Sequence, residues 1–155
     1  MHGRFPGKIA VEGNRLKADG QDVAVLSEGT PEKLPWRDLS VDIVMECTGR
    51  FTDRDGAAKH LTAGAKRVLV SAPCSNADLT VVYGVNDDKL TQEHHVVSNA
   101  SCTTNCLAPV AQVLNEAIGI KHGYMTTVHA YTGDQRTVDT PVSYTHLTLP
   151  TILLV

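Results

Sequence analysis

The sequence predicts an α/β fold. Two observations lead there: several short apolar runs suit buried strands, and a segment with helix start and stop signals separates two of them by short connections. A strand, helix, strand order with short loops is typical of a parallel sheet covered by helices. At 155 residues the chain is long enough for one domain, or for one domain and part of another.

The first strands are expected to form a small antiparallel meander. Lys8–Val11 and Val23–Ser27 are short β-prone runs, and turn signals at Gly13-Asn14 and Asp19-Gly20-Gln21 lie between and around them. The strands of the main sheet follow after a polar loop. They are expected at Val41–Met45, Arg67–Val70, Leu79–Tyr83 and His95–Val97.

Two helices are expected. The first covers Asp53–Leu61, where acidic residues come first, basic residues come later and Gly64 lies just past the end. The second starts at Ser101, a good N-cap, and ends at Gly119. Its apolar residues repeat at spacings of three and four: Leu107, Val110, Ala111, Leu114 and Ile118. A last strand is expected at Tyr124–Ala130.

Composition excludes some function classes. The chain has 42% hydrophobic and 20% charged residues and a net charge of −3, close to an average globular protein. Its Lys and Arg residues are scattered, which argues against nucleic acid or an anionic membrane as the main partner. No apolar run suits a signal peptide or a membrane span, so we expect a cytoplasmic protein.

Cys102 and His129 are the candidate catalytic pair. Cys102 directly follows the predicted N-cap, where the helix dipole favours a thiolate. If the strand–helix–strand unit is parallel, the helix descends ~24 Å and the next strand climbs ~17 Å, which returns His129 to the level of Cys102. A histidine beside such a cysteine can take and return a proton in nucleophilic catalysis. A buried cysteine with a structural histidine is the competing interpretation.

The other candidate groups favour structural roles. The four cysteines have no CxxC pair, and His94-His95 would point to opposite faces of a strand, so no metal site is expected. Cys106 lies on the same helical face as Cys102, and we expect it to pack.

The run SNASCTTNCLAP at residues 98–109 resembles the active-site signature of glyceraldehyde-3-phosphate dehydrogenases, and TTVHAYT at residues 126–132 resembles their histidine strand. HGRF, ECTGRFTDR, VLVSAP and GVN agree with the same family. The resemblance covers residues 2 to 141. It implies an incomplete Rossmann-type doubly wound parallel sheet, followed by the start of the α+β catalytic domain.

The resemblance implies that Cys102 attacks the aldehyde of glyceraldehyde 3-phosphate, that NAD accepts a hydride and that inorganic phosphate releases 1,3-bisphosphoglycerate, with His129 as the base. A homotetramer is implied for the complete enzyme. The residues that match substrate- or phosphate-binding positions are Ser101, Thr103, Thr132 and Asp134. Those that match cofactor-lining positions are Thr48, Gly49, Phe51 and Ser71.

The expected domains are residues 1–101 for NAD binding and 102–141 for the start of the catalytic domain. The Gly-rich strand–turn–helix that would hold the dinucleotide pyrophosphate is absent, so the chain is expected to be an inactive piece of a longer enzyme. Residues 142–155 do not match the family and resemble translated sequencing-adapter read-through.

Three alternatives stay open. One is erythrose-4-phosphate dehydrogenase, a related enzyme that hydrolyses its thioester. The second is a non-catalytic nucleotide-binding fragment. The third is a cysteine hydrolase, for which no Asn or acid is clearly placed to orient His129. Preference for NAD over NADP is open too, because the residue that would meet the ribose is absent.

Overall fold

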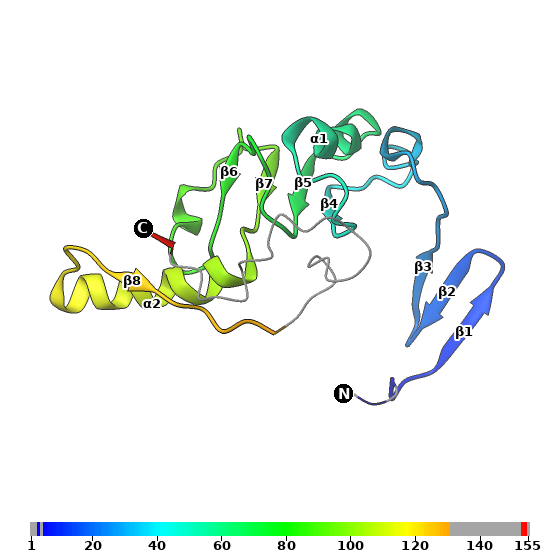
Figure 1. Ribbon diagram of the computed structural model, residues 1–155. Coiled ribbons are helices and arrows are strands. Elements are labelled where there is room, and N and C mark those ends of the chain that lie inside the picture. Colours follow the sequence, from blue (N-terminus) through cyan, green and yellow to red (C-terminus); the bar gives the residue numbers. More distant parts are fainter. Residues whose placement is uncertain (1–2, 4, 131–152, 155) are drawn as a thin grey trace, which may run out of the picture. The chain divides into compact units, whose positions relative to one another are not determined.

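The computed structural model describes residue 3, residues 5–130 and residues 153–154 (Figure 1). The chain divides into two compact units. The first contains Met1–Val81 and Leu90–Asn99, and the second contains Val82–Lys89 and Ala100–Val155.

A parallel sheet forms the centre of the first unit. Its strands lie in the order β4 (Ile43–Glu46), β5 (Arg67–Val70), β7 (Val96–Ser98) and β6 (Leu79–Thr80), and every neighbouring pair is parallel. The buried core joins this sheet to helix α1 (Arg54–Thr62) through Ala57, Val68, Val70 and Val96. The predicted α/β fold with a parallel sheet is confirmed.

Helix α1 begins and ends where its sequence signals place it. Asp53 is the N-cap, and its side chain accepts a hydrogen bond of 2.8 Å from the backbone N–H of Gly56. Beyond the helix, Gly64 has a φ of +112°, and a Cβ there would lie 2.6 Å from the Cβ of Arg37. Glycine therefore meets both the conformational and the steric requirement of this turn.

The meander has three strands, not the two predicted. β1 (Ile9–Glu12), β2 (Arg15–Ala18) and β3 (Gln21–Ala24) pair antiparallel in sequence order. We predicted no strand at Arg15–Ala18, although its alternating charged and apolar residues, RLKA, are the pattern of a half-exposed strand. Ion pairs hold its charged side to both neighbours: Arg15 to Asp22 at 2.7 Å and Lys17 to Glu12 at 2.6 Å.

Asp78 ties the start of β7 to α1. One carboxylate oxygen accepts hydrogen bonds of 2.8 Å from the backbone N–H groups of both His95 and Val96, and the other accepts one of 2.7 Å from Arg54 Nε. Burial alone would raise the pKa of this carboxyl, but the hydrogen bonds from Val96 and Arg54 outweigh it and lower the pKa below its usual value.

β6 is shorter than the predicted Leu79–Tyr83. After Thr80 the chain turns, and a short 3-10 helix, η2 (Asp87–Lys89), follows. Another 3-10 helix, η1 (Pro31–Lys33), lies before β4. In the part of the chain that the structure describes, no helix is long and apolar enough to cross a membrane.

The second unit is built on helix α2 (Cys102–Ile118). Its start is capped by Ser101, whose hydroxyl accepts a hydrogen bond of 3.0 Å from the backbone N–H of Thr104. It ends at Gly119, which has a φ of +73°. Both ends agree with the prediction.

The predicted strand Tyr124–Ala130 is largely wrong. Only β8 (Tyr124–Met125) forms, and it pairs antiparallel with β9 (Leu153–Leu154) in a sheet of its own. The premise of a parallel unit shared with β7 is therefore wrong too. A strand extends only as far as a partner satisfies its backbone groups, and here the ladder covers two residue pairs.

Candidate active site

Cys102 is the first residue of α2 and is exposed. The first backbone N–H groups of a helix lack partners inside the helix, and the helix dipole places positive potential there. A negatively charged sulfur at this position is therefore stabilised by the backbone.

His129 lies directly against this sulfur. Its Nε2 is 3.2 Å from Cys102 Sγ, and its Nδ1 is 2.6 Å from the carbonyl oxygen of Ala130. A carbonyl can only accept a hydrogen bond, so Nδ1 carries a proton and donates a hydrogen bond to the Ala130 carbonyl. In the neutral imidazole, Nε2 then presents its lone pair to the thiol, as a general base must.

The pair shifts each other's ionisation in the direction that catalysis needs. The hydrogen bond between Cys102 and His129, together with one from Thr103, outweighs burial and lowers the pKa of the Cys102 thiol. The Ala130 carbonyl and the Cys102 sulfur raise the pKa of His129. Both shifts favour a thiolate–imidazolium pair near neutral pH.

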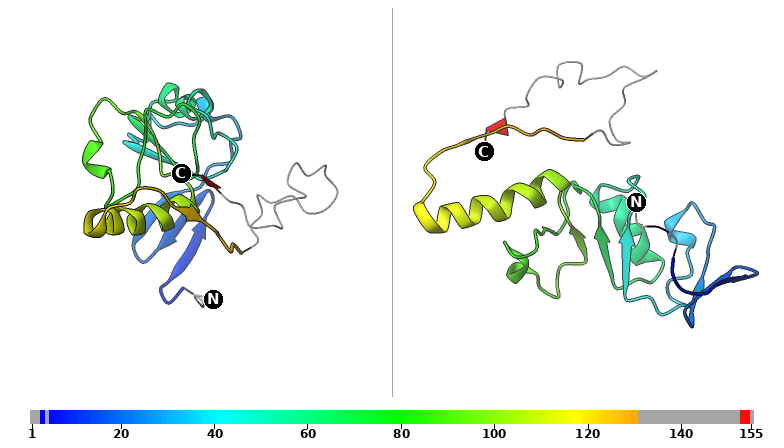
Figure 2. Two further views of the ribbon diagram at one scale, coloured as in Figure 1. Left: turned by 60° about the vertical axis from the view of Figure 1, so that its left-hand side comes forward. Right: turned by 90° about the horizontal axis from the view of Figure 1, so that it is seen from below.

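The chain brings the two residues together by a different route from the one predicted. After α2 and β8, residues 126–130 run back beside the helix toward its start without forming a strand (Figure 2). The prediction that His129 returns to Cys102 is thus supported by the structure, although the parallel strand assumed for it is absent from the described residues.

The proposed cofactor-lining residues of the first unit lie at one edge of its sheet. Thr48 and Gly49 follow the end of β4, and Ser71 follows the end of the neighbouring β5. The backbone N–H of Ser71 donates to the Glu46 carbonyl at 3.0 Å, which holds the two strand ends together. Carboxyl ends of parallel strands are where α/β proteins bind ligands.

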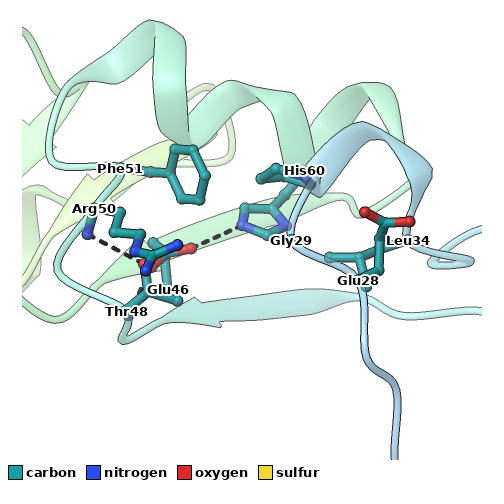
Figure 3. A pocket seen from close by; sticks show the side chains of 9 residues that line it. Glu28, Gly29, Leu34, Glu46, Thr48, Arg50, Phe51 and His60 are labelled. Carbon is teal, nitrogen blue, oxygen red and sulfur yellow. Dashed lines mark hydrogen bonds and ion pairs between the residues drawn. The ribbon is translucent and has the colours of Figure 1, made fainter.

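A pocket of about 410 Å³ lies beside this edge (Figure 3). Thr48 and Phe51 line it, whereas Gly49 and Ser71 do not. The residues that line it are Glu28, Gly29, Pro31, Leu34, Glu46, Thr48, Arg50, Phe51 and His60.

Comparison with known proteins shows what this chain is similar to. Residues 1–54 match the model of the glyceraldehyde 3-phosphate dehydrogenase NAD binding domain, and residues 101–148 match that of the C-terminal domain. The chain belongs to the glyceraldehyde-3-phosphate dehydrogenase family. The second match extends to residue 148, past Pro141, where the sequence motifs end. That residues 142–155 are not family sequence stays a prediction.

Individual relatives are similar over most of this chain. The glyceraldehyde-3-phosphate dehydrogenase of Xanthobacter flavus is 64% identical over 140 residues, which is 90% of this chain and 42% of the relative. That of Geobacillus stearothermophilus is 57% identical over 142 residues, or 91% and 42%. That of Thermotoga maritima is 51% identical over 141 residues, again 91% and 42%. This chain thus spans about two fifths of the length of these dehydrogenases.

The structure describes two of the four candidate residues for substrate or phosphate binding. The Ser101 hydroxyl caps α2 and lies 2.8 Å from the Thr104 hydroxyl, so it already has a structural role. Thr103 contributes a hydrogen bond to Cys102. Thr132 and Asp134 lie outside the described residues.

The other cysteines lack the environment of Cys102. Burial and the nearby carboxylates of Asp53 and Asp78 raise the pKa of Cys74. Cys106, which we expected to pack, is exposed, and none of the residues of α2 is buried. Cys47 is exposed as well.

Sequence reasoning missed a buried polar cluster beside the candidate cofactor-lining residues. Glu46 and His60 are each only 4% exposed and meet at 2.9 Å. Trp36 donates to the other nitrogen of His60 at 3.0 Å. The available signal was the glutamate that ends the apolar strand IVME, since a charged side chain on a buried strand needs a partner.

Proposed function

We propose that this chain carries the catalytic pair of a phosphorylating glyceraldehyde-3-phosphate dehydrogenase. The proposed reaction oxidises glyceraldehyde 3-phosphate to 1,3-bisphosphoglycerate with NAD and inorganic phosphate. The observation that carries the proposal is Cys102 Sγ at the start of α2 with His129 Nε2 at 3.2 Å.

The two residues divide the proposed chemistry between them. Cys102 attacks the aldehyde carbon as the thiolate, while the N–H groups at the start of α2 stabilise the developing oxyanion. The oxyanion takes the Nε2 proton of the His129 imidazolium, which gives the thiohemiacetal hydroxyl and leaves a neutral imidazole. His129 Nε2 then accepts the hydroxyl proton as a hydride leaves the same carbon, and a thioester remains. Attack by inorganic phosphate breaks the carbon–sulfur bond, which releases the acyl phosphate and restores the Cys102 thiolate.

NAD supplies the hydride acceptor when bound. The described residues fit one part of this cofactor: the pocket combines the ring of Phe51 with the polar side chains of Thr48 and Arg50, which suits a planar ring with hydrogen-bonding groups. A Cβ at Gly49 would meet nothing within 4 Å, so the outer side of this turn is open. Thr48, Gly49, Phe51 and Ser71 would hold the cofactor.

Ser101, Thr103, Thr132 and Asp134 are proposed to bind the substrate or phosphate, since hydroxyl groups can donate to an anion. We also place the protein in the cytoplasm and expect a homotetramer. All four cysteines are free thiols, which supports a reducing compartment.

A chimera tests the proposal. The 140 residues of the Xanthobacter flavus enzyme that align with this chain would be replaced by those of this chain. We expect the chimera to form NADH from glyceraldehyde 3-phosphate only when phosphate is present, and Cys102→Ser to abolish this. The matched control, Cys106→Ser, should keep most of the activity.

Two results would overturn the proposal. One is a folded chimera that binds NAD but oxidises no glyceraldehyde 3-phosphate. The other is equal loss from both cysteine substitutions. Oxidation of erythrose 4-phosphate in preference, without need for phosphate, would favour the related dehydrogenase instead.

A further inference from the structure

We infer that Trp36, His60 and Glu46 form a positioning network that sets the conformation of residues 48–51 for ligand binding. That the ligand is NAD rests on the proposed function. The network itself rests on the contacts of the first unit alone. Figure 3 shows Glu46, His60 and Thr48 of this network.

The direction of each hydrogen bond follows from Trp36. An indole N–H can only donate, so His60 Nδ1, which lies 3.0 Å from it, must be the acceptor. His60 therefore holds its ring proton on Nε2 and donates it to Glu46 Oε2 at 2.9 Å. A histidine with this hydrogen-bond pattern is neutral, and the negative charge of the buried pair stays on Glu46.

Glu46 uses its other oxygen to hold the turn after β4. Oε1 accepts from the backbone N–H of Thr48 at 2.7 Å and also from the Thr48 hydroxyl. Burial would raise the pKa of this carboxyl, but the hydrogen bonds from Thr48 and His60 outweigh it and lower the pKa. The carboxylate is thus kept ionised by the residues that it holds.

The network reaches both ends of the segment. The Thr48 hydroxyl in turn accepts from the backbone N–H of Arg50 at 3.1 Å, and Gly49 between them takes a φ of +71°. The ring of Phe51 meets His60 edge-on, with ring centroids 6.3 Å apart and an interplanar angle of 87°. Every residue from 48 to 51 is therefore held by the network or lies between residues that it holds.

This arrangement suits positioning better than stability alone. A buried carboxylate loses its hydration, and apolar residues of similar volume often stabilise a fold as well or better. Here the carboxylate serves backbone and hydroxyl donors of a turn that lines a pocket. A fixed turn lowers the ordering cost that a ligand would otherwise meet on binding.

The substitution Glu46→Gln tests the network because a glutamine keeps the shape but has one acceptor oxygen instead of two. Either His60 Nε2–H or the Thr48 N–H must then face an NH₂ group. Asp78→Asn is the matched control: Asp78 is also a carboxylate with N–H partners in the first unit, but it serves His95 and Val96.

The first readout is amide hydrogen exchange in the purified chain, which needs no ligand. In Glu46→Gln we expect exchange at Thr48 and Arg50 to accelerate by roughly tenfold or more, because a buried unsatisfied group is costly. Asp78→Asn should accelerate His95 and Val96 and leave Thr48 and Arg50 unchanged. The chain has one tryptophan, so the single indole N–H resonance should shift in Glu46→Gln.

The second readout is the KM for NAD in the chimera. We expect Glu46→Gln to raise it by roughly tenfold, with kcat at saturating NAD changed by less than about twofold, because the chemistry lies at Cys102. Should Glu46→Gln fail to fold, Trp36→Phe removes only one donor and should shift exchange at Thr48 and KM in the same direction.

Unchanged exchange at Thr48 and Arg50, or equal acceleration of them by Asp78→Asn, would overturn the network. Accelerated exchange with an unchanged KM for NAD would overturn its role in binding. A chimera without any NAD-dependent oxidation contradicts the proposed function instead, and the exchange result is independent of it.

Discussion

The ionisation of Cys102 gives the sharpest test of the proposed catalytic pair, Cys102 and His129. The perturbation is His129→Asn, which removes the imidazole that lies 3.2 Å from the sulfur. His122→Asn is the matched control, since His122 is exposed in the same unit and makes no described contact with Cys102. Alkylation by iodoacetamide, followed at each cysteine by peptide mass spectrometry, reports the thiolate.

The expected magnitude is modest at neutral pH. An ordinary thiol with a pKa of ~8.5 is ~3% ionised at pH 7, so full ionisation could raise the thiolate population by at most ~30-fold. A thiolate of lower pKa is also a weaker nucleophile, with a Brønsted slope of about 0.4–0.5, and this leaves a net advantage of only a few-fold. The pH profile is therefore more decisive than one rate.

The sign follows from the two shifts. Because the Cys102 pKa is lowered and the His129 pKa is raised, the alkylation rate at Cys102 should fall away at a lower pH than that of an ordinary small-molecule thiol. His129→Asn should move the midpoint of the pH–rate profile of Cys102 to higher pH, toward that of an ordinary thiol, and His122→Asn should leave it unchanged. Cys74, whose pKa is raised, should react last. A midpoint for Cys102 equal to that of the small-molecule thiol, or an unmoved midpoint in His129→Asn, would refute the reasoning.

Four further predictions follow from the same contacts. Ser101→Ala should lower the free energy of unfolding of the second unit by about 1 kcal/mol, because the N-cap hydrogen bond is lost; thermal unfolding measures this. Ser101→Asp should keep the stability but slow the alkylation of Cys102, because the carboxylate repels the thiolate. Val96→Ala should destabilise the first unit by about 2 kcal/mol in urea unfolding, because Val96 is fully buried and two methyl groups leave a cavity. The pKa of Asp78 is lowered on folding, so its contribution to stability is present above the pKa of the unfolded state and is lost as pH falls through the pKa of the folded state. In Asp78→Asn the free energy of unfolding should therefore depend less steeply on pH in acid, and an unchanged pH dependence contradicts this. The purified chain should form no NADH from glyceraldehyde 3-phosphate, because no Gly-rich phosphate loop occurs in it to position the cofactor; turnover above a Cys102→Ser control would contradict this.

Local sequence signals predicted the helices well. Asp53 and Gly64 bound α1, and Ser101 and Gly119 bound α2, as the structure has them. Caps and positive φ values are properties of one or two residues, so they can be read without knowledge of partners. The strands were less predictable: β2 was missed and β8 was far shorter than expected, because a strand depends on what lies beside it.

The same division holds for the candidate site. The sequence by itself determined that Cys102 stands at a helix start and which family carries this motif, because both depend on adjacent residues. Only the tertiary structure decided that His129 reaches the sulfur without a parallel strand, and that His60 and Trp36 orient Glu46 under the Thr48 turn. Hydrogen bonds between distant residues depend on how the chain returns, and no local pattern encodes that path.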